Sequence, residues 1–132
     1  MKALDIDSQP CLIHTAGTPK AVLIQLTARH ERKTIDSELS LIEQGSQMGF
    51  VFVGIDLQQW ALSLMPWADE AVARDPEVGR HAIDTLDYVT RQLLPYIYNR
   101  YGQLPCILGG YSVGGLFSLW AASECPLFDA VA

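Results

Sequence analysis

The chain has 132 residues and a formal net charge of −6, from 9 Lys and Arg against 15 Asp and Glu. Its 49% of hydrophobic and 18% of charged residues are typical of one folded domain and exclude a disordered chain. The acidic balance argues against binding to nucleic acid or to an anionic membrane surface, because both partners favour a surplus of basic side chains.

The cysteines and the N-terminus indicate in which cellular compartment the protein is expected. The three cysteines, Cys11, Cys106 and Cys125, cannot all pair with one another, and the sequence has no CxxC motif. We expect reduced thiols, with a single disulfide as the alternative. Asp5 and Asp7 interrupt the N-terminus before a signal peptide could form, and the apolar runs are too short to span a bilayer. These features predict a cytoplasmic protein.

The first half of the chain predicts strands that alternate with a helix. Two short segments, Ala3–Ile6 and Cys11–His14, fit an N-terminal hairpin. Nearly continuous apolar residues predict buried strands at Ala21–Leu26 and Phe50–Ile55. Between these strands, apolar residues spaced by three and four predict a helix from Thr34 to Gln44.

The middle of the chain predicts a long loop and a long helix. The connection 56–76 holds Trp60 and Trp67, and these tryptophans favour an ordered loop. The helix is expected over Arg80–Tyr98, where Pro95 should kink or restart it. Its expected apolar stripe consists of Ile83, Leu86, Val89, Leu93, Leu94 and Ile97.

The last part of the chain predicts a strand, a helix and the start of a further strand. The strand Cys106–Gly110 leads into a helix over Val113–Ser123, which we expect to carry Leu116, Leu119 and Trp120 on one side. Residues 128–132 fit another strand that stops without a cap or a turn. An apolar strand edge left open in this way is normally avoided, so we expect the chain to be a fragment of a longer protein.

This alternation of strands and helices predicts the fold class. It indicates a single α/β domain over residues 1–132, built as a three-layer αβα sandwich around a mostly parallel sheet. Ligands of such sheets bind at the carboxyl ends of the strands. Candidate functional residues are therefore expected where the strands end.

The motif with clear chemical meaning is G-x-S-x-G, at Gly110, Ser112 and Gly114. By composition alone it would occur in about one chain in twenty of this length, so the motif by itself is weak. Its context is more specific, because an apolar strand leads in and a helix leads out. A serine on such a sharp turn holds its hydroxyl above the sheet, beside the positive end of the helix. The alternative is an ordinary glycine-rich junction with a capping serine.

With this context, the sequence resembles the α/β-hydrolase superfamily, and within it the esterase branch related to enterochelin esterases and esterase D. The resemblance covers essentially the whole chain. Its carriers are the strand Ala21–Leu26, the helix end Gln92–Ile97, the elbow and helix Gly109–Trp120, and the closing segment 127–132. It implies an α/β-hydrolase fold that is truncated before its last strands.

The resemblance also implies roles for individual residues. Ser112 would be the nucleophile, and the backbone N–H of Val113 one donor of the oxyanion hole. The second donor would come from the loop 27–30, which lacks the family's usual His-Gly pair, so Thr27 and Ala28 are the backbone candidates. In the family an Asp or Glu and then a His follow the serine, but no histidine follows Ser112. We expect both groups to lie beyond Ala132, and the chain alone to be inactive or nearly so.

Four further side chains are candidates for a substrate pocket: His30, Tyr111, Trp60 and Trp67. The alternative for His30 is a solvated loop histidine, and the alternative for the tryptophans is simple cover of the sheet. The acidic residues of the loop fit no metal-ligand spacing. We therefore expect no metal and no organic cofactor.

Two hypotheses about function follow. The first is a serine hydrolase for carboxylic esters that works through an acyl-enzyme on Ser112, with a small-molecule ester or thioester as substrate. The second is a non-catalytic α/β-hydrolase-like binding or interaction protein, as the missing acid and base indicate. Neither hypothesis involves nucleic acid or a membrane. The sequence leaves the identity of the substrate and the oligomeric state open.

Overall fold

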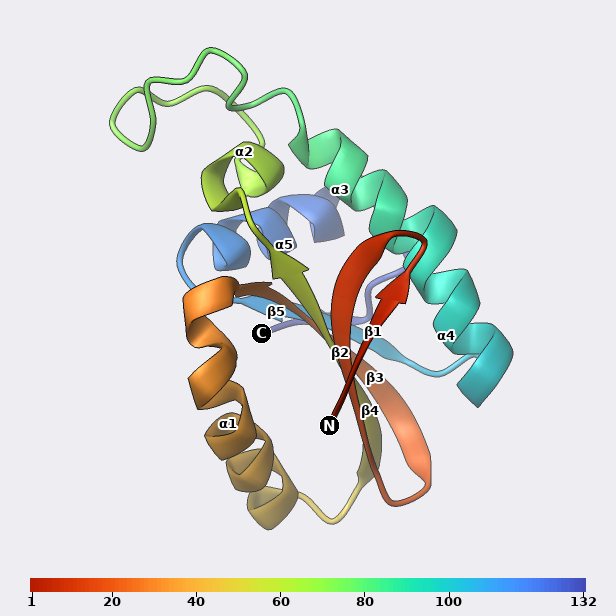
Figure 1. Ribbon diagram of the computed structural model, residues 1–132. Coiled ribbons are helices and arrows are strands. Elements are labelled where there is room, and N and C mark those ends of the chain that lie inside the picture. The colour runs from red at the N-terminus through yellow and green to blue at the C-terminus, as the bar shows by residue number, and fades with distance from the viewer.

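The computed structural model describes residues 1–132 as one six-stranded sheet with helices on both faces (Figure 1). The strands are β1 (Lys2–Ile6), β2 (Gln9–Ala16), β3 (Pro19–Ala28), β4 (Gly49–Leu57), β5 (Cys106–Gly110) and β6 (Ala130–Val131). The helices are α1 (Arg32–Gly45), α2 (Trp60–Leu64), α3 (Ala82–Tyr88), α4 (Leu94–Tyr101) and α5 (Val113–Glu124). A 3-10 turn (Arg29–Glu31) precedes α1, and a π-helical segment (Val89–Leu93) joins α3 to α4.

The sheet combines a parallel part with an antiparallel hairpin at one edge. Its strand order is β1-β2-β4-β3-β5-β6, in which β4, β3, β5 and β6 run parallel. The predicted hairpin is confirmed: β1 pairs antiparallel with β2, and β2 pairs antiparallel with β4. Asp7 and Ser8 form the hairpin turn with φ of 50° and 67°, the left-handed conformation that two-residue hairpin turns require.

Two packed cores, one on each face of the sheet, make the three layers that the sequence predicted. Because side chains of a strand alternate between the two faces, β4 contributes to both cores. Val53 and Ile55 face the larger core, which also holds residues of α3, α4 and α5. Phe50 and Phe52 face α1 and pack with Ile35 and other residues of that smaller core.

The helix expected over Arg80–Tyr98 is interrupted. The N–H of Leu94 bonds to the carbonyl of Val89, five residues back instead of four, and this spacing defines the π-helical segment. Pro95, which has no N–H to donate, follows in the first turn of α4. Ile83 is 50% exposed, so its place in the expected apolar stripe was wrong. The stripe begins instead with the buried Ala82, which lies four residues before Leu86.

Two more expectations were wrong in detail. Leu119 is 64% exposed, and α5 instead buries Gly114, Phe117 and Ala121 with Ser118. This helix is apolar on nearly every side, so spacing could not identify its buried face. The connection after β4 contains the short helix α2, whose five residues are too few to show a period. None of the helices has the length and apolar character needed to cross a bilayer.

Candidate active site

Ser112 occupies a strained turn between β5 and α5. Its φ of 54° and ψ of −116° lie outside the conformations that residues other than glycine ordinarily adopt. The residue is exposed, and no side-chain hydrogen bond caps the helix at this point. The turn is held by its backbone: the N–H of Gly114 donates to the carbonyl of Tyr111 at 2.9 Å, and the N–H of Leu116 donates to that of Ser112 at 3.1 Å. A strained residue held in this way is typical of functional sites.

The two glycines of the motif make this turn sterically feasible. A Cβ atom on Gly110 would lie 2.8 Å from the carbonyl carbon of Gly114, closer than real Cβ contacts. A Cβ atom on Gly114 would lie 3.1 Å from the ring of Trp60. The spacing of G-x-S-x-G therefore reflects the close approach of the strand end to the first turn of α5.

The start of α5 supplies a positive field beside Ser112. The first N–H groups of a helix have no acceptor within it, and the aligned peptide dipoles add partial positive charge there. Val113 is the first residue of this twelve-residue helix. Its N–H is therefore placed to donate to negative charge that develops next to Ser112.

The second candidate donors lie at the carboxyl end of β3, next to the carboxyl end of the neighbouring strand β5. Leu26 pairs with Gly110 in the parallel register, so Ala28 and Ser112 each lie two residues beyond this pair. Thr27 is buried, and its hydroxyl donates to the carbonyl of Ile55 at 2.9 Å. The sheet thus brings the candidate oxyanion-hole donors after β3 and β5 to the same end of two neighbouring strands.

A carboxylate occupies the Ala28 amide. The N–H of Ala28 donates to Oε2 of Glu31 at 2.7 Å. An oxyanion could use this amide only after the Glu31 side chain turns away. Sequence reasoning missed Glu31, although a glutamate three residues after a strand end is a known capping pattern at the start of a helix.

The four pocket candidates have different environments. Tyr111 is 76% exposed beside Ser112, and His30 is exposed in the 3-10 turn after β3. Trp67 is 50% exposed. Trp60 is half-buried and packs against Gly114, beneath the turn. Two of the four candidates therefore lie at the Ser112 turn: Trp60 packs against Gly114, and Tyr111 directly precedes Ser112 in the sequence.

Two of the three thiols are buried and poorly reactive. All three cysteines are free, and Cys11 and Cys106 are buried. Burial raises the pKa of Cys106 to about 12 and also raises the pKa of Cys11, which removes the reactive thiolate near neutral pH. No group of three or more His, Cys, Asp and Glu side chains is arranged to hold a metal ion.

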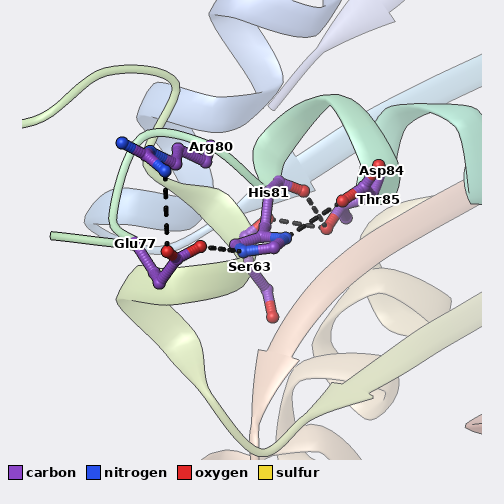
Figure 2. Close-up of polar contacts among 6 residues, drawn as sticks. All are labelled: Ser63, Glu77, Arg80, His81, Asp84 and Thr85. Carbon is purple, nitrogen blue, oxygen red and sulfur yellow. Dashed lines mark hydrogen bonds and ion pairs between the residues drawn. The ribbon is translucent and has the colours of Figure 1, made fainter. Parts of the chain in front are cut away.

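A polar hollow that the sequence did not reveal lies at the carboxyl end of β4. It has a volume of about 460 Å³ and is lined by residues from the β1–β2 turn, α2 and α3. At its rim the imidazole of His81 lies between the carboxylates of Glu77 and Asp84, 3.0 Å from each (Figure 2). Hydrogen bonds to Glu77 and then to Asp84 raise the pKa of His81 above its ordinary value.

The sequence matches no family model and no curated protein, whereas the structure matches solved esterases. Enterochelin esterase from Shigella flexneri is 19% identical with a TM-score of 0.71, over 98% of this chain and 34% of that one. Siderophore hydrolase EstA from Aspergillus nidulans is 20% identical with a TM-score of 0.65, over 92% of this chain and 52% of that one. A zinc-bound cold-adapted esterase from an Arctic intertidal metagenomic library is 15% identical with a TM-score of 0.60, over 98% and 55%.

The chain spans about a third to just over half of the length of these three structures. At identities of 20% and below, the likeness concerns the fold. The resemblance stated from the sequence is confirmed at this level, and the chain has the α/β-hydrolase fold over part of the length of the matched structures.

Proposed function

We propose that this chain carries the nucleophile of a serine hydrolase for carboxylic esters, with a small-molecule ester or thioester as substrate. The Ser112 oxygen attacks the acyl carbon, and the alcohol or thiol leaves with the proton that the serine gave up. Water then attacks the acyl-enzyme, releasing the acid and restoring the serine hydroxyl. The observation that supports this proposal most is the strained, exposed Ser112 at the start of α5.

The oxyanion hole in this proposal uses two backbone amides. The Val113 N–H is the first donor, and the second comes from the end of β3, at Ala28 or Thr27. One such donor is worth roughly a hundredfold to a thousandfold in rate. The carboxylate of Glu31 must leave the Ala28 amide before this amide can contribute.

In this proposal the base and the acid come from outside this chain. A serine hydroxyl is a poor nucleophile near neutral pH without a base. His14 is paired with Glu43, and His81 is paired with two carboxylates. His30 is exposed in the 3-10 turn after β3 and makes no hydrogen bond to Ser112, and no histidine follows Ser112. We place the catalytic acid and the histidine beyond Ala132. The greater length of the matched esterase chains supports this placement.

A non-catalytic binding or interaction protein is the alternative. The observation that favours it is the Glu31 carboxylate, which occupies a position where a hydrolase requires a free donor. In such a protein the Ser112 turn would serve as a structural junction only. The two functions differ in whether removal of the Ser112 hydroxyl changes turnover.

Hydrolysis of p-nitrophenyl acetate by the complete gene product tests the proposal. We expect Ser112→Ala to lower kcat by about a thousandfold or more, because the nucleophile is lost. Ser123→Ala is the matched control: this exposed serine lies on the same helix and bonds only to the carbonyl of Trp120. Equal turnover by the wild type and Ser112→Ala would overturn the proposal, and so would a complete absence of turnover in the wild type.

A further inference from the structure

Two adjoining hollows form a groove at the carboxyl end of β4. They have volumes of about 460 and 270 Å³ and share Gln9, Leu57, Gln59 and Ser63 in their linings. We call this the β4 groove. Its size falls in the range of small-molecule sites, and ends of parallel strands are where such sheets bind ligands.

The helix α2 separates the groove from the Ser112 turn. Trp60, at the start of α2, packs against Gly114 on the side of the turn. Ser63 lies on the groove side, where its carbonyl accepts a hydrogen bond from the Thr85 hydroxyl at 2.6 Å (Figure 2). The groove is thus a separate feature of the same sheet edge.

A buried carboxylate in the lining lacks a hydrogen-bond donor. The Asp56 side chain is 9% exposed, and its Oδ2 lies 3.4 Å from Nη2 of Arg32. Its other oxygen, Oδ1, is buried without any hydrogen-bond partner. Asp56 lines the smaller hollow. Because an unsatisfied buried acceptor is costly, a ligand donor that meets this oxygen after a rotation of the Asp56 side chain toward the hollow would be favoured.

Other polar side chains of the groove are free to bind. Gln9 and Thr85 are committed within the chain, Gln9 to the Asp56 carbonyl at 2.8 Å and Thr85 to that of Ser63. By contrast, the side chains of Gln59 and Ser63 make no hydrogen bond within the chain, although both line the two hollows. The groove therefore offers free donors as well as the Asp56 acceptor.

The charges around the groove disfavour an anion. Neither hollow is lined by a lysine or an arginine, and Asp7 and Asp84 line the larger one. The imidazole of His81, which also lines it, is held between Asp84 and Glu77, and Glu77 in turn lies 3.6 Å from Arg80 (Figure 2). The basic side chains near the groove, Arg32, Arg80 and His81, are thus already paired with carboxylates.

We propose that the β4 groove binds a small uncharged ligand rich in hydroxyl groups, of the size of a single sugar ring, with a ligand hydroxyl donating to Asp56. A hydroxyl both donates and accepts, which matches the mixture of an unpaired carboxylate oxygen, an amide and a serine hydroxyl. Arg32 already lies 3.4 Å from the Asp56 carboxylate, so the ligand need not supply positive charge there. This proposal does not depend on the role of Ser112.

Three probes with the same ring and different charges test the ligand class. They are methyl α-D-glucopyranoside, D-glucosamine and D-glucuronate, titrated into the ¹⁵N-labelled protein and followed by NMR chemical shifts. We expect saturable binding of the neutral glucoside at the groove, with glucuronate weaker by about tenfold or more, as expected when an anion faces carboxylates. The absence of saturable glucoside binding would overturn the proposal. Tighter binding of glucosamine or glucuronate would do the same.

Variants test the groove residues. Asp56→Asn should weaken glucoside binding by about tenfold or more, since a hydrogen bond to a charged acceptor is lost. Asp36→Asn, at an exposed carboxylate on α1, is the matched control and should bind like the wild type. Unchanged affinity in a folded Asp56→Asn protein would refute the assignment.

If Asp56→Asn fails to fold, a second variant tests whether the β4 groove binds the glucoside. Gln59 is exposed, so Gln59→Ala should fold normally and weaken glucoside binding by about threefold or more. An unchanged affinity in this variant would overturn the proposal. Ser112→Ala should keep the wild-type affinity. A failure of glucoside binding is therefore distinguishable from a failure of the proposed esterase function.

Discussion

Two strand-to-helix corners lie side by side at one edge of the sheet, and they are built in opposite ways. The β5–α5 corner at Ser112 is lined by glycines and holds an exposed, strained serine. The corner after β3 has ordinary backbone angles at Ala28, and its amide is covered by the Glu31 carboxylate. The Ser112 corner depends on two glycines, Gly110 and Gly114, that have no side chain. The Ala28 corner depends on the charged side chain of Glu31.

The two corners differ in how easily they can change shape. A strained non-glycine residue costs on the order of 1–3 kcal/mol, and it persists only where the surroundings over-determine it. At Ser112 the surroundings are the backbone of Gly110 and Gly114, which cannot adjust by rotating a side chain. At Ala28 one rotation of Glu31 would free the amide. We therefore expect the first corner to be sensitive to added atoms and the second to be sensitive to charge.

The largest effect is expected from Gly110→Ala. The new Cβ would press on the Gly114 carbonyl carbon, and overpacking against backbone costs about 3 kcal/mol. Urea unfolding should show this loss, and ester turnover should fall with it. Gly45→Ala is the matched control because a Cβ on Gly45 meets nothing within 4 Å. A Gly110→Ala protein as stable as the wild type would show that the backbone at Gly114 can move to make room for the added Cβ.

The second corner should respond to the charge of Glu31. Glu31→Gln removes the negative charge next to the Ala28 amide, and we expect kcat for ester turnover to rise by up to about tenfold, within the worth of one oxyanion donor. Glu38→Gln is the control, because Glu38 accepts a hydrogen bond from Gln25 on the same strand, away from Ala28. If both variants keep the wild-type rate, the Glu31 contact does not limit the reaction.

The reactivity of the Cys106 thiol reports how tightly β5 is buried. Burial raises the pKa of Cys106, the first residue of this strand, from 9.0 to about 12. At pH 8 this lowers the thiolate fraction, so iodoacetamide should modify Cys106 about a thousandfold more slowly in the folded protein than in urea. Peptide mass spectrometry measures both rates. Equal rates would show that β5 is open, and Gly110→Ala should bring the two rates closer together.

The smallest effect is expected at His81, which lies in neither corner. Its pKa is raised in the folded protein, so its contribution to stability is fully present below the ordinary pKa of about 6.5 and is lost as pH rises through the raised value. His81→Gln should therefore lower Tm by about 1 °C at pH 6 and by less at pH 9. A larger loss at pH 9 would contradict the pairing with Glu77 and Asp84.

The parts of the fold that follow local rules could be predicted from the sequence. Buried parallel strands are continuous apolar runs, so the runs in β3, β4 and β5 were found near their true positions. The Ser112 turn was also indicated, because G-x-S-x-G places bare glycines where two backbone segments meet.

Features that depend on contacts between distant segments could not be predicted. The buried face of α5 depends on what covers an all-apolar helix, so Leu119 was assigned to the wrong side. The β4 groove needs the hairpin turn at Asp7 to meet α2 and α3, which lie far along the chain. The unpaired oxygen of Asp56 is visible only once β4 and Arg32 are both in place.

Site mapping of a fluorophosphonate adduct on the complete gene product shows whether Ser112 is an activated nucleophile. The probe reacts with an activated serine hydroxyl, and peptide mass spectrometry identifies the residue that carries it. We predict one phosphonate group per chain, on the peptide that contains Ser112, and no adduct in Ser112→Ala. An adduct on another serine, or an unmodified wild-type protein, would contradict the claim that this strained turn presents a nucleophile.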